Sequence, residues 1–597
     1  MIIVDSKKGY NRFLVLVAGL GGLLYGVDVG IIGGALPYLE ATSGLSVGEL
    51  SIIVAAVLLG SVISTLFAGL LADWMGRKPV MILSGSAFVL SIPIIALSHG
   101  YETLFFGRLL QGISGGLIGL VVPLYLAECL AASNRGKGTG VFQWLLTLGI
   151  VTAAIIGIYY SYRVVGVVRT GNAAAIFAFK DQAWRRIFWV SLPPGILFVV
   201  GALFVAESPR WLFRCGRREA ARAALLRSRS PEQADIEMRE MEAVATAANS
   251  QTSAGAKAAD SLLRRKYVIP FLLACIILAC NQATGINSII AYNTNILLQS
   301  GLSDLQAHWG YVIFTSVNFL LTVVGVMLVD RKGRRFLFKI GTVGICLSQL
   351  VVGVLFLKSE HLSVDCRRSI QTLVKPDQTV DLRFDQPEAR RLLAAHREIG
   401  AGIDAARASL TVIYSYGDFS AATTALRSND PAAAPVVITR ETCVPNNRIE
   451  AFFQNPFAHL DDARTAPLRI EKAVLASIPE PGHGYLVALA LFVFMAFYAV
   501  GPGVCVWLAL SELMPTRIRS NGMSIALVLN QMVSTIVAAV FLPVVSKYGY
   551  STIFFSFGIF TMFYFVITAF FLPETKGRTL EEIEEYFEGG GKNAEVQ

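Results

Sequence analysis

Long apolar stretches alternate with short polar loops along the chain. Twelve of these stretches are about 20 residues long and carry almost no interior charge, which is the length that an α-helix needs to cross a bilayer. They begin near residues 13, 50, 79, 102, 138, 186, 267, 309, 336, 485, 518 and 551. The pattern predicts an all-α membrane protein with twelve transmembrane helices. Because twelve is an even number, we expect both termini on one side of the membrane.

Basic residues occupy alternate loops, which indicates the orientation of the chain. Lys7, Lys8 and Arg12 precede the first span, and the other basic loop residues are Arg77, Lys78, Arg135, Lys137, Arg331, Lys332, Arg334, Arg335, Arg517 and Arg519. By the positive-inside rule these loops and both termini are cytosolic. The net charge of +9 largely reflects this bias, with a possible part in holding anionic membrane lipid, so we expect no nucleic-acid partner.

The composition excludes a soluble array of domains. Of 597 residues, 54% are hydrophobic and only 16% are charged, with a mean hydropathy of +0.58. The sequence has no nucleotide-binding loop, no zinc-like spacing of Cys and His and no nucleophile elbow. We therefore expect neither an enzyme nor a site for a metal or cofactor.

One short loop occurs twice. The string DWMGRK starts at Asp73 and DRKGRR starts at Asp330, 257 residues later. Glu128 is followed seven residues on by Arg135, and Glu512 is followed seven residues on by Arg519, at an offset of 384 residues. The difference, 384 − 257 = 127 residues, predicts an insertion in the second half, which the hydropathy places at 359–484.

The repeat predicts two six-helix halves, 1–206 and 266–358 with 485–572, followed by a cytosolic tail, 573–597. Parallel halves of this kind surround a substrate site at the membrane midplane and rock against each other. Residues 207–265 read as a cytosolic linker of short amphipathic helices, or alternatively as a plain solvated linker. The insertion carries a helix candidate from Pro387 to about residue 410, and its Cys366 and Cys443 are equally consistent with a disulfide or with free thiols.

Ordered strings along all twelve spans resemble the sugar porter family of the major facilitator superfamily. They are DWMGRK, RLLQG at Arg108, PLYLAE ending at Glu128, ESPRWL at Glu207, NQATGIN at Asn281, DRKGRR, GPGVCVW at Gly501 and LPETKGRTLEEI at Leu572. The resemblance implies the major facilitator fold and a transporter of the plasma membrane that works as a monomer. The outer insertion between spans nine and ten resembles the large loop of one subclass of facilitative glucose transporters.

Asp28 is the one carboxylate within a predicted span. A charge at the bilayer centre costs about 2.5–3.5 kcal/mol on insertion scales, so it needs a partner or a function. Arg108 of span four falls at nearly the same depth by helix rise. Asp28 is therefore either a proton carrier whose protonation responds to Arg108 or half of a permanent ion pair. The six histidines lie at outer ends or in the outer loop, which argues against a histidine relay across the membrane.

The resemblance also points to proton coupling and to a sugar site. Proton-coupled symporters of the family have an Asp in a string like YGVDVGIIGG, where uniporters usually have Asn. The family's sugar-contacting positions fall on Gln143, Asn281, Gln282, Asn287, Tyr292, Asn318, Trp507 and Asn530. Any one such amide could instead hold helices together. Departures such as Asn281 for Gln, Ala291 for a gating Tyr and Gln531 for Trp leave the substrate open among hexoses, pentoses and polyols such as inositol.

The duplicated loops predict a cytosolic gate of ion pairs. Its residues are Asp73, Arg77, Glu128, Arg135, Glu207 and Arg210 in the first half and Asp330, Arg334, Glu512, Arg519 and Glu574 in the second. Charges placed only to orient the protein would explain the basic residues but not the matched acids. The function expected is import of a monosaccharide with a proton by alternating access; the alternatives are a facilitative uniporter, a polyol symporter and a non-transporting sugar sensor.

Overall fold

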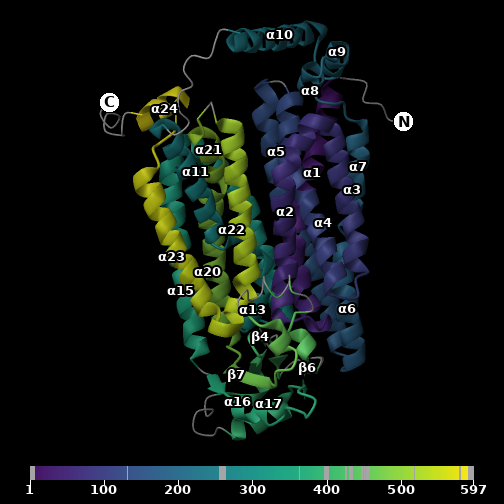
Figure 1. The fold of residues 1–597 in the computed structure, drawn as a ribbon, viewed down its shortest axis with the longest axis vertical. Coiled ribbons are helices and arrows are strands. Elements are labelled where there is room, and N and C mark those ends of the chain that lie inside the picture. The colour runs from purple at the N-terminus through teal and green to yellow at the C-terminus, as the bar shows by residue number, and fades with distance from the viewer. Residues whose placement is uncertain are drawn as a thin grey trace.

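The computed structural model has twelve helices long and apolar enough to span a membrane, arranged in two bundles (Figure 1). It describes residues 7–130, 132–253, 264–361, 363–395, 403–423, 426–428, 435–445, 448, 451, 458–515, 518–576, 578 and 580–588. Within these ranges, the side chains of 132–139, 244–253, 330, 436, 519–521, 580, 581, 584 and 588 are outside the description. The predicted all-α membrane fold is confirmed.

The first bundle contains spans one to six, the last of which is built from two helices in sequence. Its helices are α1 (Lys7–Thr42), α2 (Val47–Met75), α3 (Arg77–Ala96), α4 (Tyr101–Cys129), α5 (Ala132–Val168), α6 (Ala173–Trp189) and α7 (Leu192–Phe204). The core of this bundle is lined by small and branched apolar side chains, and α1 packs closely on α5 while α2 packs on α4.

The second bundle contains spans seven to twelve. Its helices are α11 (Arg265–Ala283), α12 (Ile286–Ala291), α13 (Asn293–Gln299), α14 (Asp304–Lys332), α15 (Arg334–Glu360), α20 (Pro481–Val500), α21 (Pro502–Leu513), α22 (Arg519–Tyr548) and α23 (Tyr550–Val566), which ends in the π-turn η3 (Ile567–Phe571). Span seven is broken at Gly285, whose φ of +78° favours glycine and whose Cβ would lie 2.4 Å from the Phe557 ring. The break leaves short helices facing the centre of the protein.

The internal repeat extends to the helix caps. Ser46 forms a capping box with Glu49 at the start of α2, and Ser303 forms one with Gln306 at the start of α14. Ser303 lies 257 residues after Ser46, the same offset that separates the duplicated loops. Both helices are 29 residues long. The two halves therefore share start, length and end at this position of the fold.

The linker and the tail lie at one end of the molecule, and the insertion lies at the other (Figure 1). The linker forms the predicted short helices α8 (Pro209–Arg214), α9 (Arg218–Leu226) and α10 (Pro231–Ser253), and the tail forms α24 (Leu580–Glu588). The start of α1 is at the same end as these helices.

The insertion forms a small domain with β structure, which the sequence analysis did not predict. Its elements are β1 (Ser363–Asp365), α16 (Arg367–Gln371), β2 (Val380–Leu382), α17 (Gln386–Ala394), η1 (Ala405–Arg407), β3 (Ala408–Tyr416), β4 (Phe419–Ala422), β5 (Leu426–Arg427), β6 (Val436–Ile438), η2 (Arg440–Thr442), α19 (Leu460–Ala463) and β7 (Leu468–Ser477). One antiparallel sheet has the order β1-β7-β3-β4, with β5 also paired to β3, and β2 pairs with β6.

One expectation about the insertion is wrong, and one open question is answered. The helix predicted from Pro387 to about residue 410 ends at Ala394, and residues 408–416 form the central strand β3 because their aromatic and branched side chains pair with β7. Of the two alternatives left open for Cys366 and Cys443, the structure has no disulfide between these buried residues. The Cys443 thiol donates to the Phe419 carbonyl oxygen at 3.2 Å.

The insertion domain covers the ends of both halves. Strand β4 lies against α2 of the first half, and β3 and β4 lie against α22 of the second. Ile413 and Ala422 belong to the same apolar core as the transmembrane helices. The domain is thus packed onto the spans rather than tethered beside them.

Candidate functional site

Asp28 lies on α1 with its carboxylate buried and without a partner. The residue is 1% exposed, and neither carboxylate oxygen has a hydrogen-bond partner among the described residues. Oδ2 lies against Gly115 of α4, where a Cβ would stand 2.8 Å from that oxygen. Glycine at position 115 therefore leaves the space that the carboxylate occupies.

Arg108 lies on α4 and is engaged elsewhere. Its Nη1 donates to Gln111 Oε1 at 2.6 Å, and its guanidinium lies 5.6 Å from the centre of the Phe188 ring. No ion pair joins Arg108 to Asp28 among the residues that the structure describes. The structure thus holds the two charged groups in one interior without the permanent pair that was one of the two alternatives.

Four polar side chains of the second half form one connected cluster. Gln282 Nε2 donates to Asn530 Oδ1 at 3.2 Å, and Asn287 Nδ2 donates to Gln282 Oε1 at 3.0 Å and to Ser534 Oγ at 2.8 Å. The cluster joins α11 and α12 to α22. Amides and hydroxyls that satisfy one another in this way can exchange partners with the hydroxyls of a ligand.

Asn281 stands beside this cluster on α11. Its Nδ2 donates to the Tyr498 hydroxyl of α20 at 3.2 Å, while its buried Oδ1 has no partner among the described residues. An unpaired buried acceptor costs free energy unless a donor reaches it. Tyr498 and Ser534 were missed in the sequence; Ser534 could have been found, because it follows Asn530 by one helical turn.

Tyr292 contacts residues of both halves and does not belong to the amide cluster. Its ring stacks on Phe541 at 4.4 Å between centroids, and its hydroxyl lies 3.2 Å from Ser51 Oγ of the first half. Ser51 Oγ also donates to the Ala538 carbonyl oxygen at 2.9 Å. These contacts join α2 of the first half to Tyr292, at the start of α13, and to α22 of the second half.

The described contacts do not connect three of the predicted sugar-contacting residues to the cluster. Gln143 on α5 is half-buried, and Asn318 on α14 accepts only from Thr322 of its own helix. Trp507 on α21 is 45% exposed. The described contacts therefore gather four of the eight predicted positions, Asn281, Gln282, Asn287 and Asn530, in one region.

The two halves are joined at their outer ends. Across that junction, Thr294 donates to the Gly33 carbonyl oxygen and Tyr311 to that of Gly30, each at 2.7 Å, and Asn295 donates to Glu40. Further bonds between the halves, from Tyr38 and Ser161 to Asp304 and from Trp309 to Tyr162, lie at the same end as the insertion domain. The arrangement is closed toward the insertion domain.

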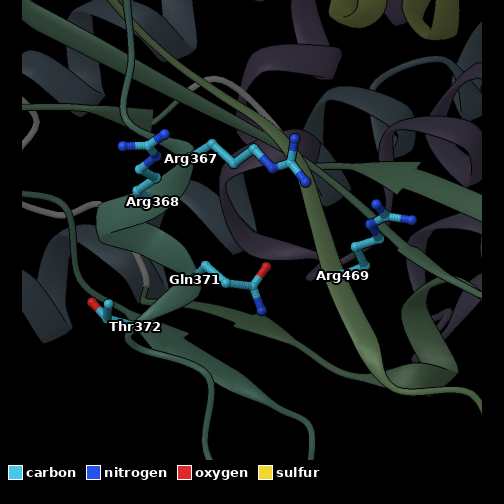
Figure 2. A pocket seen from close by; sticks show the side chains of 5 residues that line it. All are labelled: Arg367, Arg368, Gln371, Thr372 and Arg469. Carbon is cyan, nitrogen blue, oxygen red and sulfur yellow. The ribbon is translucent and has the colours of Figure 1, made fainter.

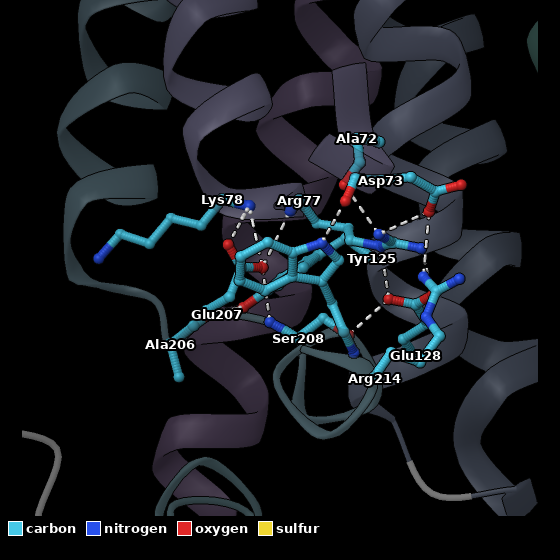
Figure 3. A network of polar contacts seen from close by, with 11 residues as sticks. Ala72, Asp73, Arg77, Lys78, Tyr125, Glu128, Ala206, Glu207, Ser208 and Arg214 are labelled. Carbon is cyan, nitrogen blue, oxygen red and sulfur yellow. Dashed lines mark hydrogen bonds and ion pairs between the residues drawn. The ribbon is translucent and has the colours of Figure 1, made fainter. Parts of the chain in front are cut away.

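The end of the first half that lies beside the linker carries a dense polar network (Figure 3). Arg77, with a side chain 3% exposed, pairs with Glu128 at 2.8 Å and with Asp73 at 3.1 Å. Glu207 accepts from the backbone N–H groups of Arg77 and Lys78 at the start of α3. Burial raises the pKa of Glu207, and these backbone donors act in the opposite direction.

The second half repeats this network. Arg334 pairs with Glu512 at 2.9 Å, and Glu574 accepts from the backbone N–H groups of Arg334 and Arg335 at the start of α15. Ser208 donates to Glu128 in the first network, and Thr575 donates to Glu512 in the second. The described contacts of each network stay within its own half.

Of the remaining predicted gate residues, one makes no ion pair with a described residue and three have side chains outside the description. Arg210 is exposed and makes no ion pair with any described residue; Arg214, one turn later on α8, pairs with Asp73 at 3.0 Å instead. The predicted partners Arg135, Asp330 and Arg519 have side chains outside the described part of the structure. In the described structure, the linker residue that contacts the network through its guanidinium is thus Arg214, while the predicted role of these residues in a gate stays a prediction.

A separate basic hollow lies on the insertion domain (Figure 2). It is lined by Arg367, Arg368, Gln371, Thr372 and Arg469. All five lining residues belong to the insertion domain, so this hollow is separate from the amide cluster of the transmembrane helices. Among the described residues, no group of three or more His, Cys, Asp or Glu could hold a metal ion.

A family model described as "Sugar (and other) transporter" matches residues 14–370 and 470–587. The chain belongs to this sugar transporter family. The match leaves out residues 371–469, which lie inside the insertion domain. The protein is therefore a multi-pass membrane transporter of the sugar porter class and not an enzyme, as the sequence predicted.

Curated relatives are similar over most of the chain. A glucose transporter, GlcP of Staphylococcus epidermidis, is 29% identical over 348 residues, which cover 58% of this chain and 72% of that protein. The proton myo-inositol cotransporter of Homo sapiens is 25% identical over 592 residues, covering 98% of this chain and 83% of that protein. These sugar transporters differ in the substrates that they are named for.

Solved structures confirm the fold. The inward-open xylose transporter XylE from E. coli superposes with a TM-score of 0.63 at 19% sequence identity, covering 96% of this chain and 98% of that chain. A likeness at this identity establishes the major facilitator architecture alone. The residues of the site are argued from their own geometry.

Proposed function

We propose that this sugar transporter imports a monosaccharide together with a proton by alternating access, as a monomer in the plasma membrane with both termini in the cytosol. The observation that carries the proposal is the Asp28 carboxylate, which is buried and has no hydrogen-bond partner among the described residues. An ionised carboxylate in such surroundings would be very costly, whereas a protonated one is tolerated. Asp28 is thus suited to bind a proton in one state and release it in another.

Arg108 supplies the means of release. In the arrangement described above it is held by Gln111, and its long side chain needs only to exchange that amide for the nearby carboxylate. An approaching guanidinium favours the ionised form of Asp28 and drives the proton off. A change in the packing of α4 on α1 within the first half, set off by rocking of the halves, would couple this exchange to transport.

The amide cluster is the proposed sugar site. A sugar offers hydroxyls that both donate and accept, and Gln282, Asn287 and Asn530 offer both kinds of group. The unpaired Asn281 Oδ1 adds an acceptor that a substrate hydroxyl can fill. Gln143 of the first half would reach the cluster when the substrate draws the halves together, and Asn318 and Trp507 would reach it by a shift within the second half.

The proton gradient supplies sufficient energy for accumulation. One proton crossing a potential of about 100 mV releases about 2.3 kcal/mol. At about 1.4 kcal/mol per factor of ten, that concentrates a neutral sugar roughly 40-fold. A uniporter of the same family would reach only equal concentrations on both sides.

A second candidate substrate class is a polyol. The relative named a proton myo-inositol cotransporter covers 98% of this chain, and a ring of hydroxyls without a ring oxygen suits the same amides. This alternative keeps the proposed role of Asp28 and changes only the cargo.

The direct test uses purified protein in liposomes that enclose a pH-sensitive dye. D-glucose, D-xylose and myo-inositol are added outside in turn, with L-glucose as the mirror-image control. We expect one of the three to acidify the interior while L-glucose does not. Uptake of a labelled sugar without any proton movement would contradict the proposal and indicate a uniporter.

A further inference from the structure

One ionisable cluster lies within the outer junction between the halves. Asp304 and His308 come from the first turns of α14, Tyr38 comes from α1 and Ser161 from α5. Asp304 Oδ2 accepts from the Tyr38 hydroxyl at 2.9 Å and from Ser161 Oγ at 2.5 Å. One carboxylate of the second half thus holds two helices of the first.

His308 is fully buried at the centre of this cluster. Its relative exposure is 0%, and its ring stacks on Tyr38 with 5.5 Å between centroids and 10° between planes. Nδ1 lies 2.8 Å from the carbonyl oxygen of Asp304, and Nε2 lies 3.3 Å from the carbonyl oxygen of Gly34 in the first half. Both ring nitrogens therefore face acceptors.

This placement distinguishes the two protonation states of the imidazole. A neutral imidazole has one N–H group and one lone pair, and a backbone carbonyl oxygen can only accept. In the neutral ring one of the two nitrogens therefore carries no hydrogen, and its lone pair faces a lone pair of the carbonyl oxygen. The imidazolium donates to both, and one of its two bonds crosses from α14 to α1.

One carboxylate lies close to the ring. Asp304 Oδ1 lies 3.6 Å from Nδ1. The other titratable or charged groups at this end of the packed elements are Tyr38 and Glu40 on α1, Tyr159, Tyr160, Tyr162 and exposed Arg163 on α5, Tyr311 on α14, and His483 and Tyr485 on α20. Tyr162 accepts from Trp309. Glu40 accepts from Asn295 and has Arg427 of the insertion domain near it. Among the described residues, the polar and ring contacts of His308 are with Asp304, Gly34 and Tyr38, and none is with a cation.

We propose that His308 is a proton-binding site of the outer junction, separate from Asp28, and that its protonation holds the two halves closed on the outer side. The inference rests on alternating access, the mechanism proposed above. In the outward-open state the ring is separated from Gly34 and reaches outer water, where it takes up a proton. Closure then brings its second N–H onto the Gly34 carbonyl oxygen, so external acid promotes closure.

The test measures the outer opening without any substrate. Spin labels are placed at Ala173→Cys, at the outer start of α6, and Lys547→Cys, at the outer end of α22, after the exposed Cys215 is changed to Ser. Their distance distribution is recorded by double electron–electron resonance from about pH 8 to about pH 5, which brackets the ordinary titration range of histidine. We expect the ratio of closed to open molecules to rise about tenfold as the pH falls.

His308→Gln is expected to abolish that rise. His361→Gln is the matched control, because His361 is exposed at the outer end of α15, and the rise should persist in it. Asp304→Asn keeps the acceptor for Tyr38 and Ser161 but removes the charge, so the midpoint of the transition should move to lower pH. This second variant tests the same contact if His308→Gln does not fold.

A pH-dependent closure that survives His308→Gln would overturn the inference, as would opening rather than closure in acid. All variants are compared in the Asp28→Asn background as well. Because the distances are read without sugar, failure here leaves proton-coupled transport intact. Failure of transport with normal pH-dependent closure would instead refute only the proposed function.

Discussion

At the scale of single residues, buried polar atoms without partners mark the groups that await a ligand. The Asp28 carboxylate and Asn281 Oδ1 are such atoms, one suited to a proton and the other to a hydroxyl donor. Their free-energy cost is tolerated only if another state of the cycle satisfies them. Gly115 shows the same specialisation, since any side chain there would meet the Asp28 carboxylate.

The cysteines of the insertion domain give a residue-scale prediction. Burial raises the pKa of Cys366 to about 11 and that of Cys443 to about 12, so both thiols are protonated at neutral pH. We expect maleimide at about pH 7 to label exposed Cys215 quickly and these two slowly, and to label all three in denaturant. Mass spectrometry of the digested protein measures the labelling. A 366–443 disulfide-linked peptide under non-reducing conditions would contradict the structure.

The sequence predicted some residues of the site and not others for identifiable reasons. Asp28 stands out because a carboxylate in an apolar span has few explanations. Tyr292 was grouped with the sugar-binding amides, yet its contacts with Ser51 and Phe541 join segments far apart in the chain. Such tertiary neighbours leave no local signal, which is also why Tyr498 was missed.

At the scale of elements, a glutamate caps the start of the equivalent helix in each half. Glu207 and Glu574 accept from the first backbone N–H groups of α3 and α15, where the helix dipole favours an anion. Gly76 and Gly333 precede those helices at φ of +100° and +86°, and a Cβ on either would touch the glutamate. The duplicated loop is therefore a structural unit of glycine, capping carboxylate and buried arginine.

Removing one partner of the buried pair should destabilise the first half. Glu128→Gln leaves the Arg77 guanidinium, with a side chain only 3% exposed, paired only to exposed Asp73. We expect a loss of about 3 kcal/mol, the cost of a buried charge that loses its partner. Thermal unfolding in detergent measures it as a lower midpoint.

Asp235→Asn is the matched control for that prediction. Its pair with Arg222 is also short, 2.8 Å, but both side chains are about half exposed, so no measurable change is expected. Equal effects of the two substitutions would show that the Arg77 pair is not special to the fold.

At the scale of the whole molecule, the insertion domain connects the two halves at the end opposite the linker. Its β4 contacts α2 while β3 and β4 contact α22, so an outward opening must part at least one of these contacts. The architecture of twelve helices followed from hydropathy alone, because each span is a local signal. The sheet did not, because β3 pairs with β7 about sixty residues later and such pairing is decided by tertiary contacts.

The insertion domain should therefore favour the outer-closed state. Ile413→Ala removes apolar contact with the transmembrane core, and we expect the closed-to-open ratio at the spin-label pair 173 and 547 to fall about fivefold. Val412→Ala, in the domain's own core, should weaken the domain without this shift. An unchanged closed-to-open ratio in Ile413→Ala would mean that the domain moves with one half only and does not resist opening.

The central claim is that Asp28 carries the coupling proton, and one comparison tests it most directly. Wild-type protein and Asp28→Asn are placed in liposomes with an inward proton gradient, and both accumulation of labelled sugar and exchange of labelled for unlabelled sugar are measured. The account predicts that the substitution abolishes accumulation while exchange continues at a comparable rate, because Asn cannot release a proton but leaves the sugar site intact. Accumulation that survives in Asp28→Asn would contradict it.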